Sequence, residues 1–269
     1  THGPASIGIA RLNVIDLDTG HQPVHNEDSS CWCVLNGEIY NYRELRKTLE
    51  DLGHCFATRS DTEVIVHAYE TYAEKFVEYL DGMFAIAIWD TRRQRLLLTR
   101  DRFGKKPLLY AHRDSWCAFA SELQALLVLP EIHRDIDPAA VGSYLSYMAV
   151  PAPQTIYRSI RKLPPAHVLT LKDGRASLRR YWQLSFVPKQ DLSDAEAAER
   201  SVELLREAVR KRLVSDVPIG AFLSGGVDSS AVVALMAELS DQPVKTFSIG
   251  FDEEAYNELP YARRVAEEF

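Results

Sequence analysis

The segment SGGVDSS, residues 224–230, restricts the fold of this chain more than any other stretch. An apolar run at residues 217–223 precedes it, and residues 230–239 have the apolar spacing of a helix. The segment is therefore predicted to join a strand to a helix N-terminus, and a second strand is predicted at residues 244–251. These elements form a βαβ unit, which implies a parallel, doubly wound sheet in the C-terminal part of the chain.

The glycine loop, as we call residues 224–230, has the composition of an anion site. Gly225 and Gly226 lack Cβ atoms, so backbone N–H groups can point at a ligand beside the positive end of the helix dipole. The loop contains neither a Walker lysine nor GxGxxG, which excludes those two nucleotide-binding motifs. Asp228 would repel a phosphate unless a divalent cation lay between them, so a magnesium ion bridging to pyrophosphate is one interpretation. The alternative is that Asp228 caps a helix starting near Ser229 and the glycines form an ordinary tight turn.

The first half of the chain consists of short strands grouped with two helices, which predicts an α+β layered domain. Helical apolar spacing marks residues 41–52 and 62–72, and Asp61 stands at the N-cap position of the second helix. The predicted strands are residues 9–16, 31–35, 82–89, 95–100, 108–112 and 117–121.

A proline-marked stretch, residues 130–189, is predicted to be a connector with short elements of its own. A helix is predicted next, at residues 193–214, because Ser193 and Glu196 have the spacing of a capping box. The length of 269 residues, 46% of them hydrophobic, is sufficient for two domains, each with its own core.

Charge and cysteine usage narrow the class of protein. The net charge is −7 and no dense Lys/Arg cluster is present, which argues against nucleic acid as a partner. Four cysteines and eight histidines show no metal-binding spacing along the chain, so no structural zinc is predicted. Cys31 and Cys33 are predicted to lie reduced against a core, as in a cytoplasmic protein.

The ends and the hydropathy give two further expectations. No apolar stretch approaches the roughly twenty residues that cross a bilayer, so no membrane association is predicted. The chain begins with Thr rather than Met, and its C-terminal domain has too few strands for a stable sheet of its type, so it is expected to be a piece of something longer.

The glycine loop after a buried strand resembles the pyrophosphate loop of the PP-loop ATP pyrophosphatases. These enzymes split ATP between the α and β phosphates and adenylate a substrate oxygen. The resemblance implies ATP and Mg²⁺ as ligands, with Asp228 holding the metal and with Leu223 and Ile249 beside the adenine or ribose. The residues implied to surround the pyrophosphate are Ser224, Gly225, Gly226, Asp228, Ser229 and Ser230.

A second resemblance covers the first half. The segments LNGEIYN, SDTEVI, DGMFAIAIWD, RDRFGKKPLLY and FASELQALL occur in that order from residue 35 to residue 127. They resemble the glutaminase domain of glutamine-hydrolysing asparagine synthetases, and with the glycine loop the resemblance covers nearly the whole chain. It implies an Ntn-hydrolase-like glutaminase sandwich, followed by a Rossmann-like PP-loop domain. The expected boundaries are residues 1–185, a type 2 glutamine amidotransferase domain with its connector and without its first strand, and residues 190–269, the start of the PP-loop domain.

The resemblance assigns roles in the glutamine site. Asn36 and Gly37 can each supply an N–H donor to the oxyanion that forms during amide hydrolysis. Arg11 would pair with the α-carboxylate of glutamine, Asp61 with its α-ammonium group, and Glu38 would hold its amide or amine end. Each residue alone has a plain structural reading: the Asn-Gly pair as a hairpin turn, Arg11 as a surface residue, and Asp61 as a helix cap.

The family's nucleophile is an N-terminal cysteine, and no such residue is found here. Thr1 is not taken as a substitute, because the residues that follow it match family sequence well inside the domain. The chain alone is therefore expected to be inactive as a glutaminase. The family's later substrate and metal segments are expected beyond Phe269.

The implied activity is the ATP-dependent conversion of aspartate to asparagine by glutamine-derived ammonia through a β-aspartyl-adenylate. Glutamine, aspartate and ATP would be the substrates, and a homodimer is left open. One alternative is an adenylating amidotransferase or cyclase of the same family with another acid substrate. Another is a non-catalytic module that binds nucleotide.

Overall fold

The computed structural model describes residues 4–10, 12, 14–114 and 116–269, and the chain divides into two compact units. Unit 1 is Thr1–Ser185 and unit 2 is Phe186–Phe269. In the described part of the chain, no helix has the length and apolar character needed to cross a membrane.

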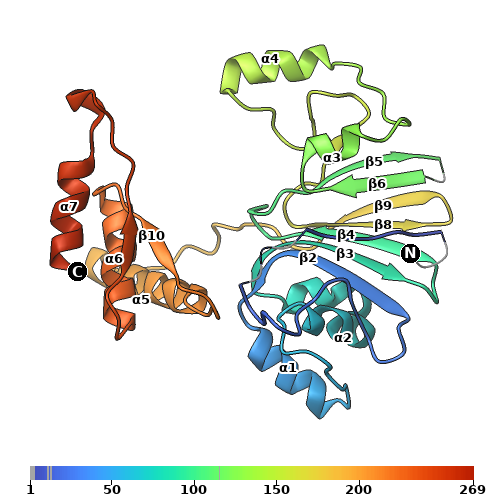
Figure 1. Cartoon of the computed structure of the whole chain (residues 1–269), viewed down its shortest axis with the longest axis horizontal. Helices are drawn as coiled ribbons and strands as arrows, with labels where there is room; N and C mark the ends of the chain where they lie inside the picture. The colour runs from blue at the N-terminus through green and yellow to red at the C-terminus, as the bar shows by residue number, and fades with distance from the viewer. Residues whose placement is uncertain (1–3, 11, 13, 115) are drawn as a thin grey trace. The chain divides into compact units, whose positions relative to one another are not determined.

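Unit 1 contains two antiparallel sheets, which Figure 1 shows one above the other. The larger sheet has the strand order β1-β2-β3-β4-β8-β9 and the smaller one the order β6-β5-β7. The strands of the larger sheet are β1 (Val24–His25), β2 (Cys31–Ile39), β3 (Gly82–Asp90), β4 (Arg95–Arg100), β8 (His167–Lys172) and β9 (Arg175–Arg180). Those of the smaller sheet are β5 (Leu109–Arg113), β6 (Trp116–Ala120) and β7 (Arg161–Lys162).

Both faces of the larger sheet are covered, which explains why β3 is buried over seven consecutive residues. On one face, a hydrophobic cluster that includes Val34, Ala87 and Leu98 packs against side chains of the smaller sheet such as Tyr110 and Phe119. On the other face lie α1 (Tyr42–Asp51) and α2 (Glu63–Tyr72), the two α-helices between β2 and β3 (Figure 1). The predicted α+β layering, with mixed helices and antiparallel strands, is confirmed in this unit.

The helices of unit 1 are close to those expected. The first two begin and end within one residue of the predicted bounds. The helical elements are α1 (Tyr42–Asp51), α2 (Glu63–Tyr72), the 3-10 helix η1 (Ala73–Tyr79), α3 (Leu123–Leu127) and α4 (Pro138–Tyr147).

Two expectations for unit 1 are wrong. The described residues of the predicted strand at 9–16 form no strand, although Ile9 still packs against the core between the sheets. The predicted connector at 130–189 contains the hairpin β8–β9, which completes the larger sheet. Asp173 and Gly174 at the tip of the hairpin have φ angles of 51° and 70°, the two positive values of a type I′ turn. The Asp-Gly pair between two β-like runs was the sequence signal for this hairpin.

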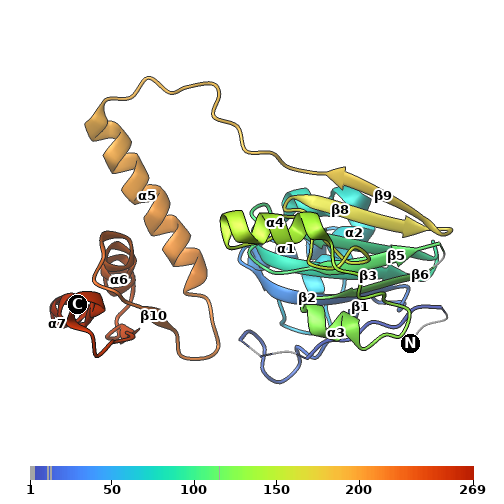
Figure 2. The same ribbon diagram turned by 90° about the horizontal axis from the view of Figure 1, so that it is seen from above.

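Unit 2 contains the βαβ unit predicted from the glycine loop. Strand β10 (Gly220–Phe222) pairs in parallel with β11 (Lys245–Phe247), and α6 (Val227–Leu239) connects them. Helix α5 (Asp194–Arg212), a single straight helix in Figure 2, begins with the predicted capping box of Ser193 and Glu196. The remaining elements are the 3-10 helix η2 (Glu254–Tyr256) and α7 (Leu259–Glu268).

Candidate functional site

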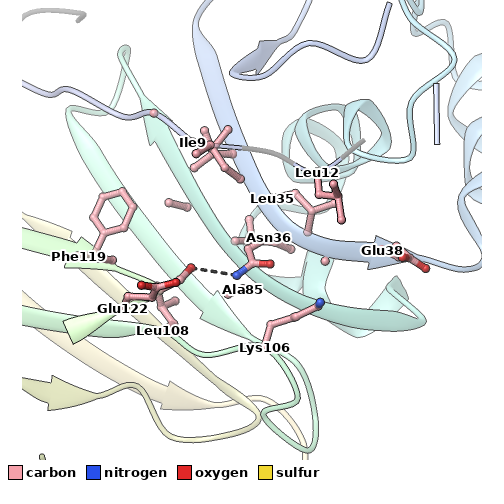
Figure 3. Close-up of a pocket in the computed structure, with 18 of the residues that line it drawn as sticks. Ile9, Leu12, Leu35, Asn36, Glu38, Ala85, Lys106, Leu108, Phe119 and Glu122 are labelled. Atoms are coloured by element: carbon pink, nitrogen blue, oxygen red, sulfur yellow. Dashed lines mark hydrogen bonds between the residues drawn. The ribbon is translucent and has the colours of Figure 1, made fainter. Parts of the chain in front are cut away.

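A cavity of about 620 Å³ lies in unit 1, and it brings together most of the residues predicted to bind glutamine. Figure 3 shows Asn36 and Glu38 on β2, with Lys106, Phe119 and Glu122 around the same space. Its lining residues are Gly8, Ile9, Ala10, Leu12, Val14, Ile15, Val34, Leu35, Asn36, Gly37, Glu38, Asp61, Ala85, Ile86, Ala87, Lys106, Leu108, Phe119, Ala120, Ser121, Glu122 and Ala125. The predicted Arg11 lies outside the described residues.

Asn36 and Gly37 stand inside strand β2, opposite Ala85 and Phe84, and so do not form a hairpin turn. The Asn36 amide donates from Nδ2 to Ser121 Oγ over 2.9 Å (Figure 3). An amide nitrogen carries two N–H donors, so this hydrogen bond uses one of them. The contact fixes the orientation of the Asn36 side chain at the pocket wall.

Gly37 is required by the close approach of the next strand. Its φ angle is +146°, and a Cβ atom added there would lie 2.0 Å from the carbonyl oxygen of Met83. Its cross-strand partner Phe84 directs both backbone groups to Asp101: Phe84 N–H donates to Asp101 Oδ2, and the Phe84 carbonyl accepts from Asp101 N–H. Gly37 and Phe84 therefore form a pair that exchanges no hydrogen bonds. In such an antiparallel pair, the backbone N–H and C=O groups of both residues point away from the partner strand, so the Gly37 N–H points to the outer edge of β2.

Side chains cover that outer edge on either side of Gly37. The Leu35 N–H donates to Gln22 Oε1 over 2.7 Å, and the Ile39 N–H donates to Asp61 Oδ2 over 2.9 Å. Strand β1 pairs only with residues 32 and 33 of β2, so it does not extend to Gly37. The backbone donor of Gly37 therefore lies between two capped positions at the edge of the sheet.

Asp61 does not cap a helix, and that reading is wrong. The N-cap of α2 is Thr62, and no side-chain hydrogen bond caps the helix. Asp61 is 2% exposed, and one oxygen holds the backbone of β2 while the side chain lines the cavity. Asp61 therefore places a buried carboxylate at the wall of the cavity.

Three polar residues of the cavity were not singled out in the sequence: Lys106, Ser121 and Glu122. All three lie in quoted motifs, RDRFGKKPLLY and FASELQALL. Lys106 lies in a loop whose conformation is fixed by hydrogen bonds among its own residues. Asp101 accepts hydrogen bonds from the N–H groups of Lys105 and Lys106, and Arg100 donates to the Lys106 carbonyl over 2.6 Å.

The two cysteines of β2 have the chemistry of core residues. Cys31 and Cys33 are buried in β2 and form no disulfide. Burial raises the pKa of the Cys31 thiol to about 12 and raises that of Cys33 well above its ordinary value. Since the thiolate is the nucleophile, neither residue is suited to attack an amide.

The glycine loop of unit 2 lies at the carboxyl end of β10, beside the end of β11. Gly225 has φ +82° and is in close contact with α7, where an added Cβ would lie 2.5 Å from Tyr261. Within the loop, Gly226 N–H donates to Ser224 Oγ and Ser229 Oγ donates to the Gly226 carbonyl. The loop is thus shaped by its own serines.

The helix after the loop begins earlier than predicted, which changes the reading of Asp228. The N-cap of α6 is Gly226, so Asp228 lies in the first turn and does not cap the helix. Its side chain is exposed, where an ion could contact it. The hydroxyl of Ser230 is buried and has no hydrogen-bond partner within the described ranges.

The two residues expected beside the adenine or ribose differ in position. Leu223 is 2% exposed and packs with Val233 and Ala262, so its side chain faces the core of unit 2. Ile249 is 73% exposed in the segment after β11. Because β10 and β11 are parallel, the segments that follow them leave the same edge of the sheet.

Both halves of the chain match models of known protein families. The family model described as "Glutamine amidotransferase domain" matches residues 1–182, and the one described as "Asparagine synthase" matches residues 201–269. The chain belongs to the glutamine-hydrolysing asparagine synthetase family.

Several curated members of this asparagine synthetase family resemble the chain over most of its length. Asparagine synthetase [glutamine-hydrolyzing] 1 of Bacillus subtilis is 39% identical over 96% of the chain and 41% of its own length. A putative asparagine synthetase of Methanocaldococcus jannaschii is 36% identical over 98% of the chain and 54% of its own length. A family relative with a different name, "Amidase chry2" of Gibberella zeae, is 33% identical over 97% of the chain and 41% of its own length. The chain thus spans about two fifths to one half of the length of these relatives.

Proposed function

We propose that this chain supplies the glutamine site and part of the ATP site of a glutamine-hydrolysing asparagine synthetase. The observation that carries the proposal is the edge of β2, where Asn36, Gly37 and Asp61 line one cavity. In an amidotransferase, a thiol attacks the side-chain amide of glutamine, and the carbonyl oxygen becomes an oxyanion. Asn36 Nδ2 and the Gly37 N–H are donors from adjacent residues that can stabilise this charge.

Recognition of the amino-acid end of glutamine needs an anion for its ammonium group and a cation for its carboxylate. Asp61 is the proposed anion, and Arg11 stays the proposed cation. Glu38 is on the same face of β2 as Asn36, because residues two apart in a strand point the same way. We assign it to the amide or amine end of the substrate.

In unit 2, the glycine loop is proposed to hold the pyrophosphate part of ATP within a Rossmann-like domain. The exposed carboxylate of Asp228 in the first turn of α6 is the oxygen ligand type that Mg²⁺ prefers, so the residues fit the ion. When bound, Mg²⁺ supplies positive charge between the carboxylate and the phosphates. The Ser230 hydroxyl and the Gly225 and Gly226 N–H groups supply further donors, and Ile249 a surface beside the base or ribose.

The whole reaction would then convert aspartate to asparagine. ATP adenylates the aspartate side chain, and ammonia from glutamine displaces AMP, giving asparagine, glutamate, AMP and pyrophosphate. An Ntn-hydrolase-like fold for unit 1, a cytoplasmic location and a homodimer stay predictions.

A second candidate function is the same chemistry with another acid as acceptor, and the relative named Amidase chry2 favours it. The two are separated by acid-dependent pyrophosphate release from ATP and Mg²⁺, with aspartate compared against other carboxylic acids. Release with aspartate alone supports the first function, whereas release only with another acid supports the second.

The glutamine site is tested by calorimetric titration of the chain with L-glutamine. Asp61→Asn keeps the acceptor for Ile39 N–H but removes the charge, so glutamine binding is expected to weaken about tenfold or more. The matched control is Asp114→Asn, because the Asp114 side chain is 90% exposed and does not line the cavity. Equal affinity of the Asp61 variant and the wild type, or no binding to the folded wild type, would contradict the proposal.

A further inference from the structure

A cluster of two histidines and two glutamates lies in unit 1 apart from the lining of the glutamine cavity. Glu27 is in the turn between β1 and β2, His54 follows α1, and His67 and Glu70 are on α2. Because His67 and Glu70 are three residues apart on a helix, they share one face of α2. One ligand atom of each of the four residues lies within 4.8 Å of the others.

His67 is the centre of this cluster and is fully buried. Neither ring nitrogen has a hydrogen-bond partner among residues with described positions. The Nδ1 atom lies 3.4 Å from Glu27 Oε2 and 3.8 Å from Glu70 Oε2, and the Nε2 atom faces Glu63 Oε1 at 3.6 Å. A buried imidazole without partners is costly, so these distances call for a group between the side chains.

The hydrogen bonds of Thr71 define the proton position on His54. The Thr71 hydroxyl donates to the His67 carbonyl over 3.0 Å, so toward His54 Nε2, 2.9 Å away, it can only accept. In the neutral ring, the proton is therefore on Nε2, and Nδ1 carries the lone pair. That Nδ1 lies 3.2 Å from Glu27 Oε1 and 3.9 Å from Glu70 Oε2.

Lone pairs and carboxylates thus face one another. Two carboxylates and the lone pair of His54 repel one another unless a cation occupies the space between them.

We propose that Glu27, His54, His67 and Glu70 bind one Zn²⁺ ion. Imidazole nitrogen and carboxylate oxygen are ligands of zinc, and four of them complete a tetrahedral coordination shell. Bonds of about 2.0–2.1 Å in a tetrahedron place neighbouring ligand atoms about 3.3 Å apart. The distances of 3.2–3.9 Å between the histidine Nδ1 atoms and the glutamate oxygens are near this value. The widest separations among the four ligand atoms, which reach up to 4.8 Å, must close further when the ion binds. Mg²⁺ and Ca²⁺ prefer sites made of oxygen alone.

The surroundings of the cluster are those of a metal site. Metal-bound histidines usually donate their second N–H to an acceptor, and here Glu63 faces Nε2 of His67 and Thr71 accepts from Nε2 of His54. Glu63 is itself fixed by the N–H groups of Ala57 and Thr58. The side chains of Glu27 and Glu70 are 37% and 25% exposed, which leaves a route from solvent.

The histidine spacing along the chain predicted no structural zinc, because the ligands come from three segments brought together only by folding. A bound ion would link the β1–β2 turn and the segment after α1 to α2. Asp61 lies two residues before α2, so the ion would stabilise the element next to the glutamine cavity without contacting substrate.

The test is titration of the untagged, chelator-treated chain with ZnCl₂ by calorimetry, and with Co²⁺ followed by its visible absorption. One tight Zn²⁺ site per chain is expected, together with a tetrahedral Co²⁺ spectrum and a higher Tm with zinc than without it. His54→Gln and Glu70→Gln are each expected to weaken zinc binding about tenfold or more, and Glu63→Gln by about 10–100-fold. The matched controls are His133→Ala and Glu131→Gln at exposed positions, which should bind as the wild type does.

Circular dichroism shows whether each variant is folded. The substituted residues His54 and Glu70 lie at the more exposed edge of the site, so the test requires no substitution of the fully buried His67. Absence of tight zinc binding to the folded chain would overturn the proposal and leave protons as the compensating cations. Zinc binding that is equally tight in the His54 and Glu70 variants would place the ion elsewhere and also overturn it. Glutamine and ATP are absent from this test, so its result is independent of the proposed function.

Discussion

In the cavity of unit 1, Asp61 is 2% exposed and accepts a backbone hydrogen bond from β2, whereas in the glycine loop Asp228 is exposed and lies in the first turn of a helix. The cavity of unit 1 is built into a sheet covered on both faces, so its polar groups are held before any ligand arrives. The loop of unit 2 forms hydrogen bonds among its own serines and glycines. A ligand there must replace some of these bonds, while a ligand in the cavity meets groups already fixed.

The largest expected effect tests how rigid the cavity is. Gly37→Ala would place a Cβ atom 2.0 Å from the Met83 carbonyl at a positive φ, so we expect it to destabilise unit 1 by about 3 kcal/mol or more. Urea unfolding followed by tryptophan fluorescence measures this. Gly142→Ala in α4 meets no atom within 4 Å and should instead stabilise the chain by about 0.5–1 kcal/mol. A Gly37 variant as stable as the wild type would show that the edge of β2 is adaptable.

The next prediction concerns acid stability, which should differ between the two units. Asp90 is 1% exposed in β3 and accepts hydrogen bonds from the Tyr69 hydroxyl and from Arg93. Burial tends to raise the pKa of Asp90, but the Arg93 N–H, the Tyr69 hydroxyl and the Arg93 guanidinium hold that pKa below its ordinary value. In unit 2, the lowered pKa of Glu196 belongs to an exposed side chain at the start of α5.

A carboxyl group with a lowered pKa in the folded state stabilises the protein above its unfolded pKa, and this contribution is lost as the pH falls through the folded value. We therefore expect Asp90→Asn to lower the Tm by several degrees at pH 7, and the difference from the wild type to shrink below about pH 4. Glu196→Gln should show a much smaller pH-dependent difference. Scanning calorimetry between pH 7 and pH 3 checks both, and a constant Tm difference for Asp90→Asn would contradict the assignment.

A smaller effect, on binding alone, is expected in the glycine loop. Asp228→Ala should weaken Mg²⁺-dependent ATP binding about tenfold or more and leave the Tm unchanged, because this side chain is exposed. Calorimetric titration with ATP, with and without Mg²⁺, measures it. Asp241→Ala, exposed after the other end of α6, is the matched control. ATP affinity that is unchanged both by Mg²⁺ and by the Asp228 substitution would contradict the proposed role of Asp228 in holding the metal ion.

The smallest effect on stability is expected for Ser230→Ala in the same loop, where stability and ATP binding should respond differently. The buried Ser230 hydroxyl has no partner in the part of the chain that the structure describes, so Ser230→Ala should alter stability by less than about 0.5 kcal/mol. If the hydroxyl contacts pyrophosphate, the same variant should bind ATP several-fold more weakly. Thermal unfolding and ATP titration distinguish the two. A large loss of stability would instead assign Ser230 a structural role.

Local patterns along the sequence were sufficient for much of the fold. The capping box of Ser193 and Glu196, the βαβ unit around the glycine loop and most strands of unit 1 were predicted, because each depends on residues close together in the chain. Strand pairing over long distances was not predicted. The β8–β9 hairpin joins β4 across about seventy residues, and its Asp-Gly turn was the only local sign of it.

In the candidate site too, the sequence predicted some features and the tertiary structure decided the others. The motifs identified Asn36, Gly37 and Asp61, but not that Gly37 directs its N–H to the sheet edge or that Asp61 holds β2 instead of capping α2. These facts depend on which neighbour each backbone group pairs with, and a one-residue change of register would reverse them. The sequence by itself determined the elements, the family motifs and the chemistry available. Only the tertiary structure decided which side chains meet, including the four ligands of the proposed zinc site, because folding brings their distant segments together.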